Sequence, residues 1–266
     1  MIRLKSPREI EKMRRAGIVV ARALRLVREM AAPGVSTGAL NEAVERLFQQ
    51  AGAEPLFKGV TSGPGKPPFP AVICASVNEQ VVHGVPGDYV LKEGDILSVD
   101  TGCRLDGWCA DAAITIPIGR ISPEDQRLLD VTRETLEIAI REMGRARKWS
   151  QVAKKMEEHV RRHRFSIVDQ FVGHGIGRQM HEEPQVPNLV SKALLRRDFT
   201  LQPGLVLAVE PMVNAGTNRV RVTEDHWTVV TLDGSRSAHF EHTIALTHSG
   251  PRVLTADPEC EERLSL

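Results

Sequence analysis

Cysteine is scarce in this chain, and its few cysteines are scattered. The 266 residues contain four of them, and no two form a Cys-x-x-Cys pair. This argues against both a disulfide scaffold and a thiolate zinc site. The cysteines are Cys74, Cys103, Cys109 and Cys260.

An excess of one charge is also lacking, as are long apolar runs. The 35 Lys and Arg nearly cancel the 34 Asp and Glu, so nothing favours nucleic acid as the main ligand. No stretch approaches the ~20 apolar residues of a membrane helix, and the charged segment 1–17 does not resemble a signal peptide. With 41% hydrophobic residues, we expect a reduced, cytoplasmic, globular protein without a membrane partner.

The N-terminal region carries the signals of two helices. Ser6-Pro7-Arg8-Glu9 provides an N-cap hydroxyl, a proline for the first turn and a glutamate that completes a capping box. Apolar residues then recur at helical spacing until Pro33-Gly34. A second helix is predicted from about Ser36 to Gly52.

The same order of elements returns 116 residues later, at Ser122-Pro123. One helix is predicted to end near Gly144, and Ser150 is predicted to cap another. A stretch rich in Val, Ile and Thr follows each helix pair. Chance recurrence of a common helix start is the alternative, but the repeated order favours an α+β fold of one domain, with two pseudo-symmetric halves (about 1–120 and 121–266) around a curved sheet.

Two acids are predicted to lie on the same face of a hairpin in the first half. If Asp106-Gly107 forms the two-residue turn, Asp111 pairs with Gly102. Asp100 then points to the same face as Asp111, because it lies two residues from Gly102. Their Cα atoms would be diagonal neighbours roughly 7–8 Å apart, a distance that suits two acids that bind shared cations.

Glu210 and Glu241 occupy similarly apolar stretches in the second half. Any single acid here could face water, but four buried carboxylates would need partners or metal ions. Two divalent cations would balance their charge, and oxygen ligands with an imidazole suit Mn, Fe, Co or Zn. His174, within Gly-His-Gly-Ile-Gly, is the candidate imidazole, although a turn residue is the alternative.

The order Asp100, Asp111, His174, Glu210, Glu241 occurs within specific local motifs: Val-Asp-Thr-Gly, Gly-His-Gly-Ile-Gly, Val-Glu-Pro-Met and Glu-His-Thr. This pattern resembles the dinuclear metallopeptidases of the pita-bread fold, and within them the type I methionine aminopeptidases. The resemblance implies that Asp111 and Glu241 bridge two ions. Asp100, His174 and Glu210 would complete the ligand set.

The resemblance also implies an activity and roles for further residues. A water with a pKa lowered by the two cations would attack the first peptide carbonyl. Glu210 would act as the base, His181 would stabilise the oxyanion, and His83 would contact the scissile amide. The expected product is the N-terminal methionine of a nascent protein or peptide with a small second residue.

An apolar pocket should select methionine. By resemblance, Cys74, Phe69 and Trp227 line it, although ordinary core packing is the alternative for all three. The chain departs from the family pattern at three places. Met180 precedes His181 where an aromatic residue is common, the segment 57–68 lacks the usual Cys and Tyr, and Ala208 replaces a frequent threonine.

Two further expectations come from the same family similarity. A monovalent cation is expected near Asn78 and Ser237. Action on nascent chains implies proximity to ribosomes, and the first helix carries a basic group that could contact them, although a solvated helix face explains these charges as well. The group is Arg8, Lys12, Arg14 and Arg15. The enzyme is expected to act as a monomer.

Two rival functions remain on the same fold. A Xaa-Pro-directed aminopeptidase or prolidase would use the same five ligands, but such relatives usually carry an extra N-terminal domain, for which no room is left before Ser6. A binding protein that has lost its metals normally has broken ligand positions, whereas all five are intact here.

Overall fold

The structure, a computed structural model, describes residues 2–259. Its helices are α1 (Pro7–Met30), α2 (Thr37–Ala51), α3 (Pro123–Met143), α4 (Trp149–Arg162) and α5 (Lys192–Arg196). Its strands are β1 (Glu54–Pro55), β2 (Cys74–Val77), β3 (Gln80–Val82), β4 (Ile96–Leu105), β5 (Trp108–Pro117), β6 (Ser166–Ile167), β7 (Gly173–Gly175), β8 (Glu182–Val186), β9 (Val206–Val209), β10 (Met212–Asn214), β11 (Val220–Val222), β12 (Val229–Thr231), β13 (Ser237–His239), β14 (Glu241–Thr247) and β15 (Gly250–Val253).

Three of the four predicted helix starts are confirmed. In α1 the Ser6 hydroxyl accepts the Glu9 N–H at 3.4 Å, and Glu9 accepts the Ser6 N–H at 2.8 Å. This is the capping box that the sequence indicates. Ser36 and Ser122 cap α2 and α3 with their hydroxyls, which accept the N–H groups of Ala39 and Asp125.

The start of α4 differs from the prediction, because Ser150 is not its cap. The helix begins at Trp149 after Lys148, and the side-chain oxygen of Gln151 accepts the Lys148 N–H at 3.1 Å. Ser150 lies inside the first turn, where its hydroxyl donates to Asp198 at 2.7 Å. The Ser150 hydroxyl, which was predicted to cap the helix, is thus bound to the carboxylate of Asp198, from a loop that is distant in sequence.

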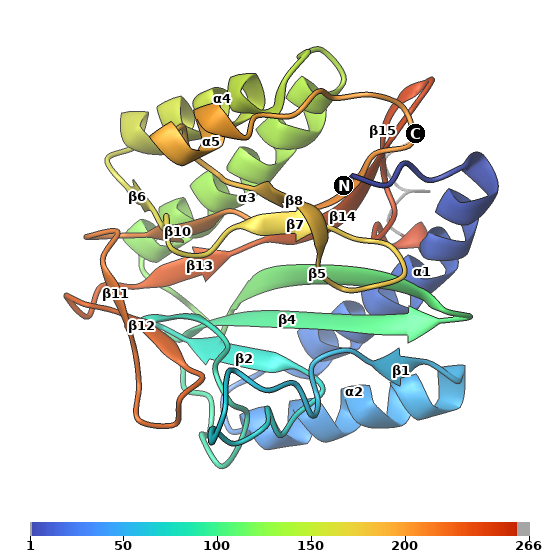
Figure 1. The fold of residues 1–266 in the computed structure, drawn as a ribbon. Helices are drawn as coiled ribbons and strands as arrows, with labels where there is room; N and C mark the ends of the chain where they lie inside the picture. Colours follow the sequence, from blue (N-terminus) through green and yellow to red (C-terminus); the bar gives the residue numbers. More distant parts are fainter. Residues whose placement is uncertain (1, 260–266) are drawn as a thin grey trace.

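The main sheet has nine antiparallel strands, and it joins the two halves of the chain. Seven of them run in the order β1-β4-β5-β14-β9-β7-β8, while β2 pairs with β4 and β15 pairs with β14. The junction is the β5–β14 pair, where Ala113 faces Glu241. Figure 1 shows α1 beside β4 and β5 and α2 next to α1 and β1, whereas α3 and α4 lie on the other side of the junction.

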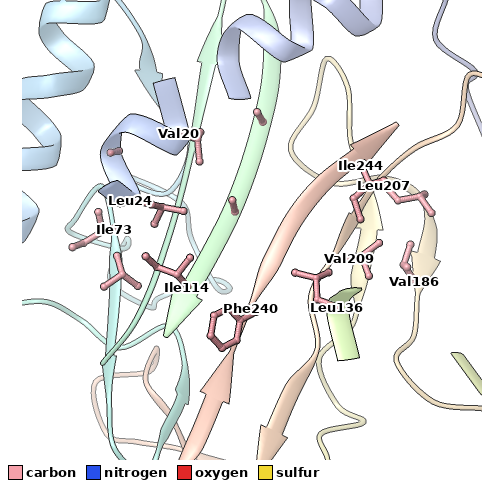
Figure 2. Packing of buried hydrophobic residues seen from close by; sticks show 14 of the residues in the cluster. Val20, Leu24, Ile73, Ile114, Leu136, Val186, Leu207, Val209, Phe240 and Ile244 are labelled. Atoms are coloured by element: carbon pink, nitrogen blue, oxygen red, sulfur yellow. The ribbon is translucent and has the colours of Figure 1, made fainter. Parts of the chain in front are cut away.

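One apolar cluster continues across this junction. Leu24 and Ile114 from the first half and Leu136 and Ile244 from the second belong to the same buried cluster, and Figure 2 shows them on both sides of β5 and β14. Close packing of these side chains resists sliding of one half over the other. The angle between the two strand systems, and with it the position of every acid on them, is therefore held by the core.

Two predictions from composition can also be compared with the structure. The cysteines Cys74, Cys103 and Cys109 are free and buried, whereas Cys260 lies outside the described residues. Among residues 2–259, no helix combines the length and apolar character needed to cross a membrane.

Candidate metal centre

The β4–β5 hairpin places Asp100 and Asp111 on one face, as the turn predicts. Gly102 pairs with Asp111 and Asp100 pairs with Ala113. Asp111 can turn inward because its partner is glycine: a Cβ at position 102 would lie 2.9 Å from Asp111 Oδ1. The Thr243 hydroxyl of β14 accepts the Asp111 N–H at 3.0 Å and donates to its carbonyl at 2.8 Å, so the second half holds the backbone of this acid.

Glu210 and Glu241 approach the same region from the second half. Glu241 is the first residue of β14, opposite Ala113. Glu210 follows the end of β9, and the Asn188 side chain donates to its carbonyl oxygen at 3.0 Å. Strand pairing thus brings acids that are up to 141 positions apart to one side of the junction.

His174 lies on a short strand, β7, and not in a turn. It pairs with Ala208 and Gln185 on either side. The neighbouring glycines allow this close approach, because a Cβ at Gly173 would lie 2.3 Å from the Ala208 carbonyl oxygen and one at Gly175 would lie 2.2 Å from that of Glu183. The proposal that glycines let the imidazole come close is supported, whereas the turn alternative is wrong.

The ring of His174 is prepared to act as a ligand. Its Nδ1 lies 2.9 Å from the Gly175 carbonyl oxygen, which can only accept, so Nδ1 carries the proton and the Nε2 lone pair is free. Nε2 lies 3.7 Å from Glu210 Oε1. Burial, followed by repulsion from His181, lowers the pKa of His174 to about 4, which keeps the ring neutral.

The pKa values of the four carboxyl groups are raised, and three of these groups have an oxygen without a partner. Burial is the first cause of the raised pKa of Asp100, Asp111, Glu210 and Glu241, and repulsion among them adds to it in all but Asp111. One buried oxygen of each of three of these acids has no hydrogen-bond partner; the oxygens are Asp100 Oδ1, Asp111 Oδ1 and Glu241 Oε1. Such groups are costly unless a cation neutralises them.

The residues fit divalent cations. Ligand atoms of Asp111, His174 and Glu241 lie within 4.8 Å of one another. A second set with the same closeness consists of Glu210, His239 and Glu241. Two overlapping groups that share Glu241 suit a pair of ions, and carboxylates with imidazole favour metals such as Mn, Fe, Co or Zn.

His239 is a residue of this region that the sequence analysis missed. It is 1% exposed, and its Nε2 has no hydrogen-bond partner and lies 4.0 Å from Glu241 Oε2. Burial, followed by repulsion from His83, lowers its pKa to about 3. The available signal was its spacing, since residues two apart in an extended chain share a face.

A pocket with a volume of about 180 Å³ opens over these acids. Every residue predicted to bind the divalent ions or the substrate lines it, together with Phe57 and Val60, which were not predicted. The predicted residues are Phe69, Cys74, His83, Asp100, Asp111, His174, Met180, His181, Glu210, Trp227 and Glu241. The full set therefore shares one cavity.

The apolar wall of the pocket is built by the loop 57–69 and Trp227. The rings of Phe69 and Trp227 meet edge to face with centroids 5.2 Å apart. The Trp227 Nε1–H donates to the Pro67 carbonyl oxygen at 3.0 Å. The segment 57–68, which departs from the expected family pattern, thus holds the indole of Trp227 in this wall.

His83 and His181 lie on the other walls. His83 adopts a left-handed backbone conformation, with φ of 58°, and burial, followed by repulsion from His181, lowers its pKa to about 4. His181 is exposed at the rim, where its ring packs edge to face on His174 with centroids 4.3 Å apart. Desolvation also lowers the pKa of His181, so both rings are neutral near pH 7.

Two other predicted sites lie outside the pocket lining. The Ser237 N–H donates to the Asn78 carbonyl oxygen at 2.9 Å, so these residues adjoin as the cation prediction requires. The basic group on α1 is not one surface: Arg14 is buried and donates to the carbonyl oxygens of Leu254 and Ala256 at 2.8 and 2.6 Å. Arg14 is therefore neither a ribosome contact nor part of a solvated helix face.

Comparison with known proteins gives this site a family. The family described as metallopeptidase family M24 matches residues 11–248. The chain belongs to metallopeptidase family M24. The resemblance inferred from the motifs is confirmed, and with it the pita-bread fold.

Within the M24 family the similar proteins fall into two groups. The chain is 44% identical to methionine aminopeptidase 1 of Bacillus subtilis, over 96% of this chain and 99% of the relative. The crystal structure of methionine aminopeptidase from Thermotoga maritima has a TM-score of 0.90 and 43% identity, with 97% and 100% of the chains covered. The prolidase of Pyrococcus horikoshii has a TM-score of 0.75 at 19% identity, and only 63% of that chain is covered, so it shares the fold alone.

Proposed function

We propose that this protein is a methionine aminopeptidase, a metal-dependent exopeptidase that removes N-terminal methionine from nascent proteins and peptides with a small second residue. The observation that carries the proposal is the meeting of four carboxylates, two buried and two half-buried, and one imidazole under an apolar pocket. Relatives with this name that match nearly the full chain support it.

The chain's own residues would hold two divalent ions. The residues that would hold them are Asp100, Asp111, His174, Glu210 and Glu241. When bound, such ions supply Lewis-acid chemistry, which lowers the pKa of the attacking water and polarises the peptide carbonyl. The unpartnered oxygens of Asp100, Asp111 and Glu241 are the atoms available for this task.

Proton transfer would fall to Glu210 and the two histidines of the walls. Glu210 would take the proton of the attacking water, since its carboxylate lines the pocket beside the other acids. His181 at the rim would donate to the developing oxyanion. The neutral ring of His83 would contact the scissile amide nitrogen, and the proton on Glu210 is then available to the leaving amine.

Pocket shape would set the substrate. Phe69, Trp227, Cys74 and Met180 offer an apolar wall for one unbranched thioether side chain. The free α-amine of the substrate would lie against the acids, which limits cleavage to one residue from the end. We propose accordingly that Met180 and the loop 57–68 shape the selectivity for methionine over other apolar side chains.

Further expectations from the resemblance belong to the same proposal. They are a single catalytic domain of two halves, a cytoplasmic location, action as a monomer, transient contact with ribosomes, and a monovalent cation near Asn78 and Ser237. The adjoining of Asn78 and Ser237 supports the last of these.

The deciding experiment is a metal-reconstituted peptide assay with mass detection of the released amino acid. Chelation should abolish release of methionine from Met-Ala-Ser, and added Co²⁺ or Mn²⁺ should restore it. Faster cleavage of Xaa-Pro peptides would identify the prolidase-type rival. Unchanged turnover in Glu210→Ala would contradict the assigned base, and absence of turnover in the metal-loaded protein would favour a binding protein.

A further inference from the structure

A second group of metal-binding residue types lies on the outer helices. His159 is in the last turn of α4, His163 is the C-terminal cap of that helix, and Glu134 is on α3. We propose that Glu134, His159 and His163 form a further binding site for a divalent ion of the zinc, nickel or cobalt class. None of these three residues lines the pocket over the acids, so the inference does not depend on the peptidase function.

The spacing of the three residues suits one ion. The two histidines are four positions apart, so their rings project from the same face of α4. Their ring centroids are 4.8 Å apart, and His159 Nε2 lies 3.2 Å from Glu134 Oε2. One ligand atom of each residue lies within 4.8 Å of the others. Atoms bound to one zinc ion at about 2.1 Å are at most about 4.2 Å apart, so only small side-chain movements are needed.

The core beneath these residues holds their backbones in place. Val160, which follows His159, packs with Leu128 and Val131 of α3 in one buried cluster. Figure 1 shows α3 and α4 side by side at the edge of the molecule. The two helices therefore present their ligands in a fixed relation, and an ion needs to order only side chains.

The charges around His159 favour a cation. Its Nε2 is buried and, among residues 2–259, has no partner in good hydrogen-bond geometry, although Glu134 Oε2 lies 3.2 Å away. Burial, followed by repulsion from His163, lowers the pKa of His159, so the ring can offer a lone pair at neutral pH. Arg162 opposes a cation here, whereas Glu134 and the negative end of the α4 dipole attract one. Two imidazoles and a carboxylate suit these metals, with water in the remaining position.

The test uses Zn²⁺ as the probe in a background that cannot fill the catalytic centre. Chelator-treated Asp111→Asn/Glu241→Gln protein should bind one Zn²⁺ per chain by calorimetry and elemental analysis. Adding His159→Ala/His163→Ala should remove that ion, whereas His248→Ala, at an exposed histidine of the β14–β15 turn, should keep it. Glu134→Gln should weaken the affinity by about tenfold or more.

The same comparison in the wild-type background guards against a misfolded variant. Wild-type protein should bind three Zn²⁺ per chain, and His159→Ala/His163→Ala protein should bind two and keep its peptidase activity. Equal stoichiometry in these two proteins would overturn the inference. So would a Zn²⁺ affinity of the Asp111→Asn/Glu241→Gln protein that is unchanged by loss of both histidines.

Discussion

The floor and the rim of the pocket are built in different ways. The floor carries Asp100, Asp111, His174 and Glu241 on paired strands, where backbone hydrogen bonds set each position. The rim carries Met180, His181, Trp227 and the segment 57–68 on loops. Metal ligation tolerates little displacement, whereas an apolar wall can be rebuilt with other side chains.

The expected departures from the family pattern can be placed on this division. Two of the three, Met180 and the segment 57–68, lie at the rim on loops. The third, Ala208, lies on β9 opposite His174 and is fully buried. Four of the five proposed ligands thus lie in the part that strand pairing constrains.

The largest effect should come from the floor. Asp111→Asn keeps the shape of the side chain but removes the charge and one ligand, so bound metal should fall and kcat/KM should decrease by about 10³-fold or more. Asp106→Asn, in the exposed turn of the same hairpin, is the matched control and should retain both. Full metal content and activity in Asp111→Asn would contradict the proposal that Asp111 binds the metal ions.

At the rim, His181→Ala should separate chemistry from metal binding. Loss of an oxyanion donor typically lowers kcat by about 10²- to 10³-fold, and metal content should be unchanged because His181 is no proposed ligand. Kinetics and elemental analysis on the same samples decide this, with Gln179→Ala, an exposed position outside the pocket lining, as the control. A parallel loss of metal would mean that His181 also contributes to metal binding, as proposed for the residues of the floor.

A smaller effect is expected for the apolar wall. Trp227→Ala removes both the edge-to-face contact with Phe69 and the hydrogen bond to Pro67, so the preference for Met over Leu peptides should fall by about tenfold. Trp227→Phe keeps an aromatic ring and should lose less. The ratio of kcat/KM for Met peptides to that for Leu peptides measures the change. An unaltered ratio in Trp227→Ala would mean that this wall does not determine the preference for methionine.

The last effect concerns the stability of the sheet and not catalysis. Burial lowers the pKa of His242 on β14 to about 4, while the unfolded chain binds a proton below about 6.5. The free energy of unfolding should therefore fall as the pH drops from 6.5 to 4, by at most about 1.4 kcal/mol per pH unit from this group. His242→Gln should make the slope shallower in denaturant titrations, and His248→Gln should not. Identical slopes in wild type and His242→Gln would contradict it.

Much of the site could be predicted because its signals are local. The Asp106-Gly107 turn set the register that pairs Gly102 with Asp111, and the hydroxyls of Ser6 and Ser122 marked their helices. The misses have a shared cause. Ser150 contacts Asp198 in place of capping, and Arg14 is buried against the segment that follows β15.

His174 and the group on α3 and α4 show which contacts local sequence could not predict. No neighbour in sequence reveals that β8 and β9 flank His174. His159 meets Glu134 only because α3 packs on α4.

The amino-acid order alone was sufficient for the helix starts, the hairpin register, the acids out of place among apolar residues and the family that these motifs resemble. These depend on residues a few positions apart, or on patterns shared with relatives. The meeting of Asp111 with Glu241, by contrast, required the β5–β14 pair and the core that spans it. Distances between such groups arise from the packing of whole layers, which no short stretch of sequence encodes.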